Sequence, residues 1–469
     1  MAEQVFESFL STPDVTALFG EASVLQAMLD FEAALARAQG AEGVIPAEAA
    51  ATIAAACRSD LLDLPAVVAA SGRAGSLAIP LVKKLTDAVS RIDADVAGYV
   101  HWGSTSQDVI DTALVLASRR ALALIDRDLT ALIAALLDLA DAHGNAPVLA
   151  RTLMQPAQVV SFGLKLVGWI APLVRGQQRL RAAGLAALRL QLGGAVGTLA
   201  VMGDKANAVA QRVADELKLT LPAGAWHTQR DQMVSLACEI GVLVGSLGKI
   251  AKDISLLAQG EVAELAEPSG SGRGGSSAMP HKRNPVGSMI VLAAALRVPH
   301  RVSALLAAMV QEHERGLGNW QAELAETAGL YITAHGAVNA LAGVAGGLQV
   351  DAPRMLSNIA ALQGLVFAEA VSMHFATRIG KSQAHALLER LSQEVVASGR
   401  HLRELTLDAL ARDDALRGVI HADEVRALFD PDHAAQRAVD VAAPQLASLR
   451  EQALAGVSQA PWGEFLPAD

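Results

Sequence analysis

Two long stretches of the chain carry apolar residues at alternating steps of three and four, which is the spacing of one face of an α-helix. The first stretch consists of Leu122, Ile125, Leu129, Leu132, Leu136 and Leu139. The second consists of Met233, Leu236, Ile240, Leu243, Leu247, Ile250, Ile254 and Leu257. Both are heptad patterns, which are typical of long helices packed side by side at small crossing angles.

Residues that begin or end helices set the expected bounds. The first helix is predicted to begin near Asp111 and to end before Gly144, and the second to end at Pro268. Further helices are predicted over 155–190, after Pro285 and across 327–350. The apolar faces are wider than one partner helix requires, because neighbouring positions are apolar too. These positions are Ala121, Ala123, Ala135, Val242 and Val244. We therefore expect a bundle that other copies of the chain complete.

The pattern changes on either side of this region. Up to residue 110 the helices are shorter and are interrupted by prolines. Leu25, Met28, Phe31 and Leu35 share a face there, and the prolines are Pro46, Pro65 and Pro80. Beyond about residue 351 the helices shorten again and charge rises. The sequence thus predicts an all-α fold of three helical domains, at 1–110, 111–352 and 353–469.

Composition narrows the class of protein. Of the 469 residues, 52% are hydrophobic and 18% are charged, which is too apolar for a disordered chain. The net charge of −10 lacks the basic footprint of a nucleic-acid-binding protein. The two cysteines, Cys57 and Cys238, cannot build a disulfide framework and fit a reducing compartment.

One uncharged stretch, 327–350, is long enough to span a bilayer. Its glycines and polar residues favour a buried helix of the bundle instead. The N-terminus shows no basic region followed by an apolar run, so it does not resemble a signal peptide. We expect a soluble, cytoplasmic protein with no membrane partner.

The window 270–285, GSGRGGSSAMPHKRNP, concentrates groups that can carry chemistry. Its glycines allow the loop to move and to close over a site. Serines, a lysine and an asparagine crowd just ahead of Pro285, which is well placed to begin a helix, and helix N-termini attract anions. A flexible linker would explain the glycines but not this crowding.

The segment GSSAMPHKRNP at 275–285 resembles the signature GSSxMPxKxNP of the fumarase/aspartase superfamily and matches every specified position. HWGSTSQDVIDTA at 101–113 and RTLMQPAQVVSFG at 151–163 resemble the other two shared regions of that superfamily. The resemblance implies three helical domains, a twenty-helix core built by the central bundles of a homotetramer, and active sites that draw on three subunits. This agrees with the heptad patterns.

The resemblance also implies a chemistry and a set of site residues. Superfamily members remove or add a proton beside a carboxylate through a dianionic aci-carboxylate, whose charge requires preorganised cations and hydrogen-bond donors. By the motif match, Ser276 transfers the proton, and Lys282 and Asn284 stabilise the aci-carboxylate. The implied substrate-binding residues are His101, Thr105, Ser106, Gln107, Arg151, Thr152, Gln155, Arg230, Ser277, Met279 and Arg315.

Some of these residues also allow a plainer interpretation. Residues 106–111 could simply cap a helix. His227, Arg230, His313 and Arg315 are plausible substrate ligands, but each could instead form a salt bridge. No His or Cys cluster has metal-ligand spacing, and the glycine-rich segment 193–198 is expected to shape a turn beside the site, so no metal or cofactor is predicted.

Departures from the superfamily pattern indicate which reaction is catalysed. Amide-cleaving members such as adenylosuccinate lyase carry RTHxQ, whose histidine protonates the leaving nitrogen, and a glutamate that orients it. Here these two positions are Leu153 and Met289. An amine must be protonated as it leaves, whereas a carboxylate is a weak base and need not be. Apolar residues at both positions therefore favour the opening or closing of a lactone.

One branch of the superfamily performs that reaction, the bacterial 3-carboxy-cis,cis-muconate cycloisomerases of protocatechuate (β-ketoadipate) degradation. The chain resembles this branch at 31–38, 78–83, 226–231, 252–257, 311–320 and 363–372. Trp320 and Leu324 also stand where adenylosuccinate lyases carry polar phosphate ligands. The branch is expected to carry Trp at position 153, so Leu153 indicates a remodelled pocket.

The sequence thus predicts an intramolecular lyase that closes a small tricarboxylate, 3-carboxy-cis,cis-muconate, to 4-carboxymuconolactone. Two alternatives remain open at this point. One is a fumarate-releasing lyase of the adenylosuccinate or argininosuccinate type, which Leu153 and Met289 disfavour. The other is a non-catalytic, crystallin-like structural protein, which would have no need of Ser276 and Lys282 together.

Overall fold

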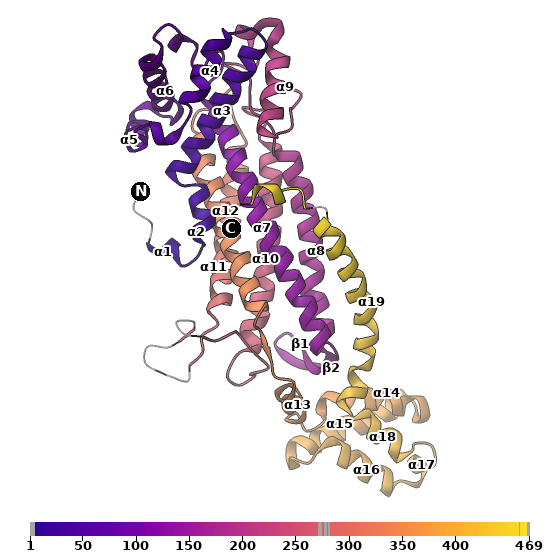
Figure 1. Cartoon of the computed structure of the whole chain (residues 1–469). Coiled ribbons are helices and arrows are strands. Elements are labelled where there is room, and N and C mark those ends of the chain that lie inside the picture. Colours follow the sequence, from indigo (N-terminus) through magenta and orange to yellow (C-terminus); the bar gives the residue numbers. More distant parts are fainter. Residues whose placement is uncertain (1–4, 271–273, 276–278, 280–281, 459, 467–469) are drawn as a thin grey trace.

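The computed structural model describes residues 5–270, 274, 275, 279, 282–458 and 460–466. It is a long helical bundle with smaller helical groups at its two ends (Figure 1). The helices are α1 (Val5–Ser8), α2 (Pro13–Leu18), α3 (Glu21–Ala41), α4 (Ala47–Ala56), α5 (Leu64–Ala74), α6 (Ala78–Ile92), α7 (Ser106–His143), α8 (Phe162–Ala187), α9 (Ala206–Leu217), α10 (Asp231–Leu257), α11 (Val286–Ala308), α12 (Asn319–Ala345), α13 (Ala352–Ala360), α14 (Ala368–Ile379), α15 (Lys381–Ser398), α16 (Leu402–Arg412), α17 (Asp414–Arg417), α18 (Ala422–Leu428) and α19 (Pro431–Ser458). The strands are β1 (Pro147–Thr152), β2 (Gln155–Ser161), β3 (Leu265–Ala266) and β4 (Gln349–Val350). The predicted all-α class is confirmed.

The two heptad patterns lie on α7 and α10 and form the core of the bundle. All their residues are buried apart from Leu139 and Met233, which are half-buried. α7 and α10 pack with α8, α11 and α12. The apolar spacing in the sequence therefore identified the central helices and the faces that they bury.

Several predicted helix bounds were wrong. α7 begins at Ser106 rather than near Asp111, because the Asp108 carboxylate accepts the backbone N–H of Thr105 (3.1 Å) and caps the helix. α10 ends at Leu257, well before Pro268. α12 begins at Asn319 and ends at Ala345, and the residues 349–350 that follow pair with β3.

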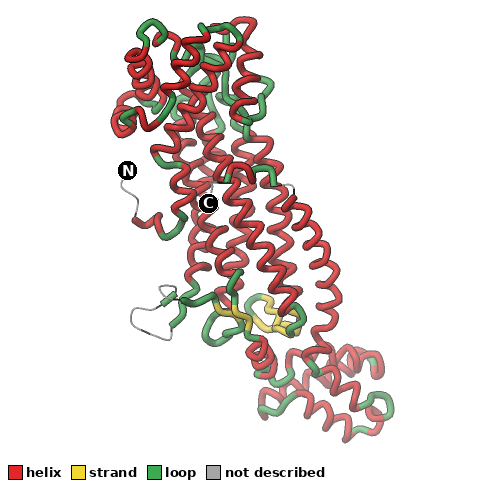
Figure 2. Tube along the Cα trace, in the orientation of Figure 1, coloured by secondary structure: helices red, strands yellow, loops and turns green. Residues whose placement is uncertain are grey.

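The largest error is at 155–190, where a hairpin precedes the helix. β1 and β2 pair in antiparallel fashion before α8 begins at Phe162 (Figure 2). Leu153 and Met154 form the turn with left-handed backbone, at φ 50° and 69°, which non-glycine residues rarely adopt. Leu153 is 96% exposed at this tip.

The N-terminal helices share one continuous core with the bundle. Pro65 and Pro80 lie in the first turns of α5 and α6, so they begin these helices rather than break them. Helices α13 to α18 gather at the opposite end of the molecule, largely around a second core (Figure 1). α19 then returns along α8, where Leu449 is buried. The division at 1–110, 111–352 and 353–469 stays a prediction.

Two helices, α10 and α11, are long and apolar enough to cross a membrane by length and composition alone. Half of the apolar window of α10 is buried within the chain, but only 22% of that of α11. On α11, Met289 and Leu296 are 49% and 73% exposed, and Val242 on α10 is 52% exposed. This apolar surface lies on the central bundle.

Candidate active site

The residues singled out from the sequence form two groups at opposite ends of α7. One group surrounds the start of α7 at Thr105, and the other lies near the β1–β2 hairpin that follows its end (Figure 1). A helix of 38 residues is about 57 Å long. One chain therefore does not bring the two groups together. Ser276 and Ser277 lie outside the described residues.

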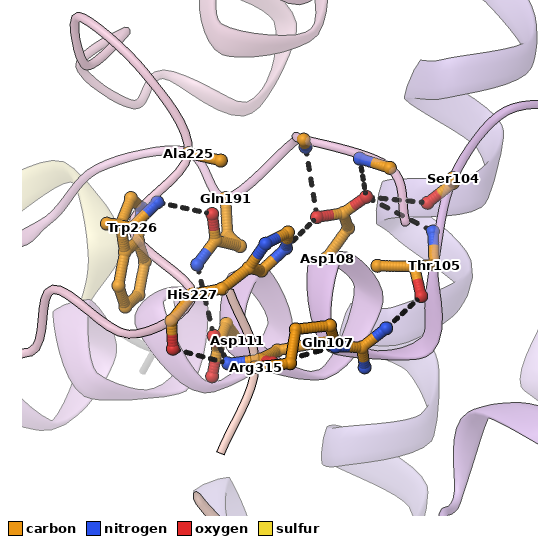
Figure 3. Close-up of polar contacts among 12 residues, drawn as sticks. Ser104, Thr105, Gln107, Asp108, Asp111, Gln191, Ala225, Trp226, His227 and Arg315 are labelled. Atoms are coloured by element: carbon orange, nitrogen blue, oxygen red, sulfur yellow. Dashed lines mark hydrogen bonds and ion pairs between the residues drawn. The ribbon is translucent and has the colours of Figure 1, made fainter. Parts of the chain in front are cut away.

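Arg315 joins the first group from the loop between α11 and α12. Its Nη1 donates to the Thr105 hydroxyl at 2.6 Å, and its Nε lies 3.3 Å from Oε1 of Gln107 (Figure 3). The guanidinium is half-buried and these two partners are neutral, so its charge is not compensated by them. This arrangement can bind an anion beside the start of α7. His313, by contrast, is exposed.

Gln107 does not fit its expected role as a substrate ligand. It is 1% exposed, and its amide Nε2 donates to the carbonyl of His227 (2.8 Å) and to Asp111 (3.2 Å). Both amide N–H groups of Gln107 therefore already donate to other acceptors, and this fixes the amide so that its oxygen faces Arg315. The structure gives Gln107 the task of orienting Arg315, while Thr105 and Ser106 remain half-buried at the start of the helix.

Asp108 holds the glycine-rich segment against the start of α7. Its carboxylate accepts the backbone N–H groups of Gly193 (3.0 Å) and Gly194 (2.9 Å), and Nε2 of His227 lies 2.7 Å from it. Gly194 has φ +66°, and a Cβ there would lie 2.9 Å from the carbonyl oxygen of Gly103. The segment does shape a turn beside this group, as predicted, and His227 is buried rather than directed to solvent.

Arg230 was expected to bind substrate, but it is a buried structural cation. It is 1% exposed and donates to Asp111 at 2.8 Å and to Glu323 at 2.9 Å. Burial alone would lower the pKa of Arg230, but the two carboxylates outweigh burial and raise it above its ordinary value. Burial raises the pKa of Glu323. With both partners engaged, Arg230 is not available to a substrate.

Trp320 was expected to face the substrate in place of a phosphate ligand. It is instead buried in the core, where its Nε1 donates to Asp111 at 2.9 Å. It therefore supports the carboxylate that also holds Gln107 and Arg230, and its buried ring is not open to a substrate.

The second group centres on Arg151 and Glu264. The Arg151 guanidinium donates to both oxygens of Glu264, at 2.7 and 2.9 Å, and Asn358 donates to the same carboxylate at 2.8 Å. The Glu264 side chain is fully buried, whereas that of Arg151 is 23% exposed. Thr152 and Gln155 lie exposed at the end of the hairpin.

The backbone N–H groups at the start of α11 are already bound to a side-chain carboxylate of the same chain. Glu267 accepts the backbone N–H groups of Gly287 (2.9 Å) and Ser288 (2.8 Å), which satisfies donors that the sequence suggested for a substrate. A cavity of about 720 Å³ opens beside it, and Lys282 and Asn284 line this cavity together with Glu267. Lys282 is exposed and Asn284 half-buried, whereas Met279 is 43% exposed.

Sequence reasoning missed the carboxylates that hold the site together. Glu264, Glu267 and Glu323 meet their partners only through tertiary structure, and no local pattern marks them. Asp108 lies within 106–111, the segment that the sequence suggested as a helix cap, and its carboxylate does cap α7. Among the described residues, no group of three His, Cys, Asp or Glu side chains could hold a metal ion.

Comparisons with known proteins agree with this architecture. A family profile described as "Lyase" matches residues 9–300, and one described as "Adenylosuccinate lyase C-terminus" matches residues 364–443. The 3-carboxy-cis,cis-muconate cycloisomerase of Bradyrhizobium diazoefficiens is 48% identical over 90% of this chain and 93% of its own length. The nitrosuccinate lyase of Streptomyces davaonensis is 40% identical over 89% of each chain.

The fold has equally close counterparts among solved structures. The 3-carboxy-cis,cis-muconate lactonizing enzyme from Pseudomonas putida is 43% identical, with a TM-score of 0.90 over 96% of this chain and 100% of its own. Fold and profiles together define a helical enzyme of the lyase class. The chain belongs to the fumarase/aspartase superfamily, whose members are soluble enzymes that act on small substrates.

The different surroundings of Arg230 and Arg315 predict different effects on stability. Arg230→Met leaves Asp111 and Glu323 buried without their cation, which should cost about 3–5 kcal/mol of unfolding free energy. Arg315→Met removes a half-buried cation whose partners are neutral and should change stability little. Thermal unfolding of the two variants measures this. Equal melting temperatures would contradict the structural role of Arg230.

Proposed function

We propose that the chain is a 3-carboxy-cis,cis-muconate cycloisomerase, which closes its tricarboxylate substrate to 4-carboxymuconolactone. The observation that carries this proposal is the match to relatives of that name over about nine tenths of the chain. The chemical reason is the pair of apolar residues, Leu153 and Met289, where an amine-releasing lyase requires an acid and its partner.

The proposed reaction begins when one carboxylate oxygen of the substrate adds to an alkene carbon and forms the lactone C–O bond. The alkene electrons move to the neighbouring carbon and into its carboxylate, which becomes the aci-carboxylate. Lys282 and Asn284 stabilise this charge by a cation and a hydrogen bond. The hydroxyl of Ser276 then gives its proton to the neighbouring carbon and takes another from water. The trianionic substrate thereby takes up one proton and becomes a lactone dianion, and the two are isomers as free acids.

The remaining residues are assigned by their surroundings. Arg315, with Thr105 and Ser106, is proposed to bind one substrate carboxylate, while Gln107 orients it. On the other side of the site, Thr152, Gln155 and Ser277 supply neutral donors, Met279 supplies apolar contact, and Arg151 adds a partly exposed cation. Arg230 is left out, because its guanidinium is fully buried between Asp111 and Glu323, whereas that of Arg151 stays partly exposed beside Glu264.

The site is proposed to form between subunits of a cytoplasmic homotetramer. Chemistry needs its groups within a few ångströms of the substrate, yet in one chain Thr105 and Arg151 are separated by the length of α7. The exposed apolar surface around Val242, Met289 and Leu296 offers a face for other copies, which would build the twenty-helix core. The separation and the surface support the same assembly.

A second candidate is an elimination that also expels a weak base. A nitro-substituted succinate would lose nitrite, which like a carboxylate leaves without a proton donor. The 40% identity to a nitrosuccinate lyase favours keeping this candidate. Amine-releasing lyase activity has less support, because Leu153 and Met289 replace the acid and its partner. A purely structural role has less support, because the loop signature is complete.

The first test is a spectrophotometric assay with 3-carboxy-cis,cis-muconate, run beside assays with nitrosuccinate and argininosuccinate. We expect turnover of the muconate alone. Ser276→Ala should lower that turnover by at least about 10²–10⁴-fold, because a positioned proton donor is lost. Lys282→Met should be similarly slow, because Met fills the space without the charge. Near-normal turnover in Ser276→Ala would remove this serine from the mechanism.

Shared sites predict complementation between inactive variants. A Lys282→Met chain and an Arg315→Met chain carry their defects at opposite ends of α7. When mixed tetramers form, some sites combine two intact groups and activity should return to a fraction of wild type. Each variant incubated alone under the same conditions is the control. Activity measured in a sedimenting monomer would contradict the shared site.

Because a carboxylate needs no proton donor to leave or add, restoring the acid at position 153 should not speed lactonisation. Leu153→His with Met289→Glu restores the residues of the amine-releasing lyases. The new negative charge should weaken binding of a tricarboxylate, so lactonisation should fall and amine release should rise only to a trace. Initial rates with muconate and argininosuccinate measure both. Faster lactonisation in the double variant would show that the reaction does need an acid there.

A further inference from the structure

Among the described residues, the buried carboxylate of Glu32 has one hydrogen-bonding side-chain partner. It lies on α3 and is 1% exposed, and its Oε1 is 2.6 Å from Nδ1 of His101. Its other oxygen, Oε2, is buried and has no hydrogen-bond partner within the part of the chain that the structure describes. A buried carboxylate that makes so few hydrogen bonds is costly to fold. Its retention at this place calls for an explanation beyond packing.

The partner, His101, lies in a strained turn just ahead of the candidate site. Its φ of +60° is in the left-handed region, which a non-glycine residue keeps only where its surroundings fix it. α3 supplies two such contacts from residues seven positions apart. Glu32 holds the imidazole ring, and Gln39 donates to the carbonyl of Trp102 at 2.6 Å. Strain held in this way concentrates at functional sites.

The charges around His101 favour its protonated form. Burial alone would lower the pKa of His101, but the carboxylates of Glu32 on α3 and Asp108 on α7 outweigh burial and raise it above its ordinary value. The thiol of Cys57, which also faces Glu32, remains neutral because burial raises its pKa. The hydrogen bond found for the ring uses Nδ1, and the side chain is 19% exposed. Nε2 is therefore the ring nitrogen that can meet a ligand.

We propose that Glu32 is a positioning residue of the active site, which holds the His101 ring through Nδ1 and directs its Nε2–H group to a carboxylate of the substrate. This rests on the proposed function, and it adds Glu32 to the residues that the reaction needs. His101 precedes Thr105 by four residues, and both adjoin Asp108. A cationic imidazole four residues ahead of Thr105, which Arg315 contacts, suits a substrate with three negative charges.

Glu32→Gln tests this proposal in the full-length enzyme, because the amide keeps the shape and an acceptor oxygen but loses the charge. KM and kcat for the muconate are measured between about pH 5.5 and 8.5. Between the pH at which the ring loses its proton in the variant and the higher pH at which it does so in the wild type, we expect KM of the variant to be about fivefold to tenfold higher and kcat to change less than twofold, as when a charged donor becomes neutral. At lower pH, where the ring is protonated in both enzymes, their KM values should converge.

Gln39→Leu is the matched control, since it removes the other contact from α3 to the same turn without touching the His101 ring. As the pH is raised, KM of Gln39→Leu should begin to increase at the same pH as KM of the wild type, because the charge of Glu32 is unchanged. If Gln39→Leu shifts the profile as far as Glu32→Gln does, the effect comes from the turn and the role of Glu32 is overturned.

Hydrogen–deuterium exchange at the histidine ring carbon, read by mass spectrometry, reports protonation without any turnover. The midpoint for His101 should move to lower pH in Glu32→Gln, and the midpoint for the distant His374 should not. An unmoved His101 midpoint overturns the proposal. A moved midpoint with an unchanged KM overturns the assignment of His101 as a ligand. If the wild type does not turn over the muconate, the proposed function fails, while the exchange midpoint still decides whether Glu32 controls His101.

Discussion

The first two turns of α7 bury two carboxylates, Asp108 and Asp111, and the structure around the site depends on satisfying them. A buried carboxylate requires hydrogen-bond donors from several directions. Asp108 takes them from the start of its own helix, from the glycine-rich turn and from His227. Asp111 takes them from Gln107, Gln191, Arg230 and Trp320. Three distant segments, around 191–194, 227–230 and 320, are thereby drawn to one helix end.

This network separates the residues that hold the site from those that can meet a substrate. Asp111 and the carbonyl of His227 accept the amide N–H groups of Gln107, which turns its oxygen to Arg315. Arg230 neutralises the buried carboxylates and lies out of reach of a ligand. Residue type alone would make both arginines equal candidates. Their burial and their partners distinguish them.

The length of α7 sets the other constraint. A straight helix cannot bring its own ends together, so the group at Thr105 and the group at Arg151 need partners from elsewhere. The apolar tip of the β1–β2 hairpin, with its left-handed backbone and its fully exposed Leu153, lies at the far end. Helices that are apolar on more than one side fit the same requirement for further copies.

The long central helices, the all-α class and the superfamily could all be predicted from the amino-acid sequence, because apolar spacing and a complete loop signature are local features. The sequence also located the start of α11 after Pro285. It could not determine the hairpin at 147–161, whose strands are short and depend on pairing with each other. Nor could it distinguish Arg230 from Arg315, or find Glu32, Glu264 and Glu267. The role of a charged side chain depends on which groups reach it across the fold, and only the tertiary structure decides that.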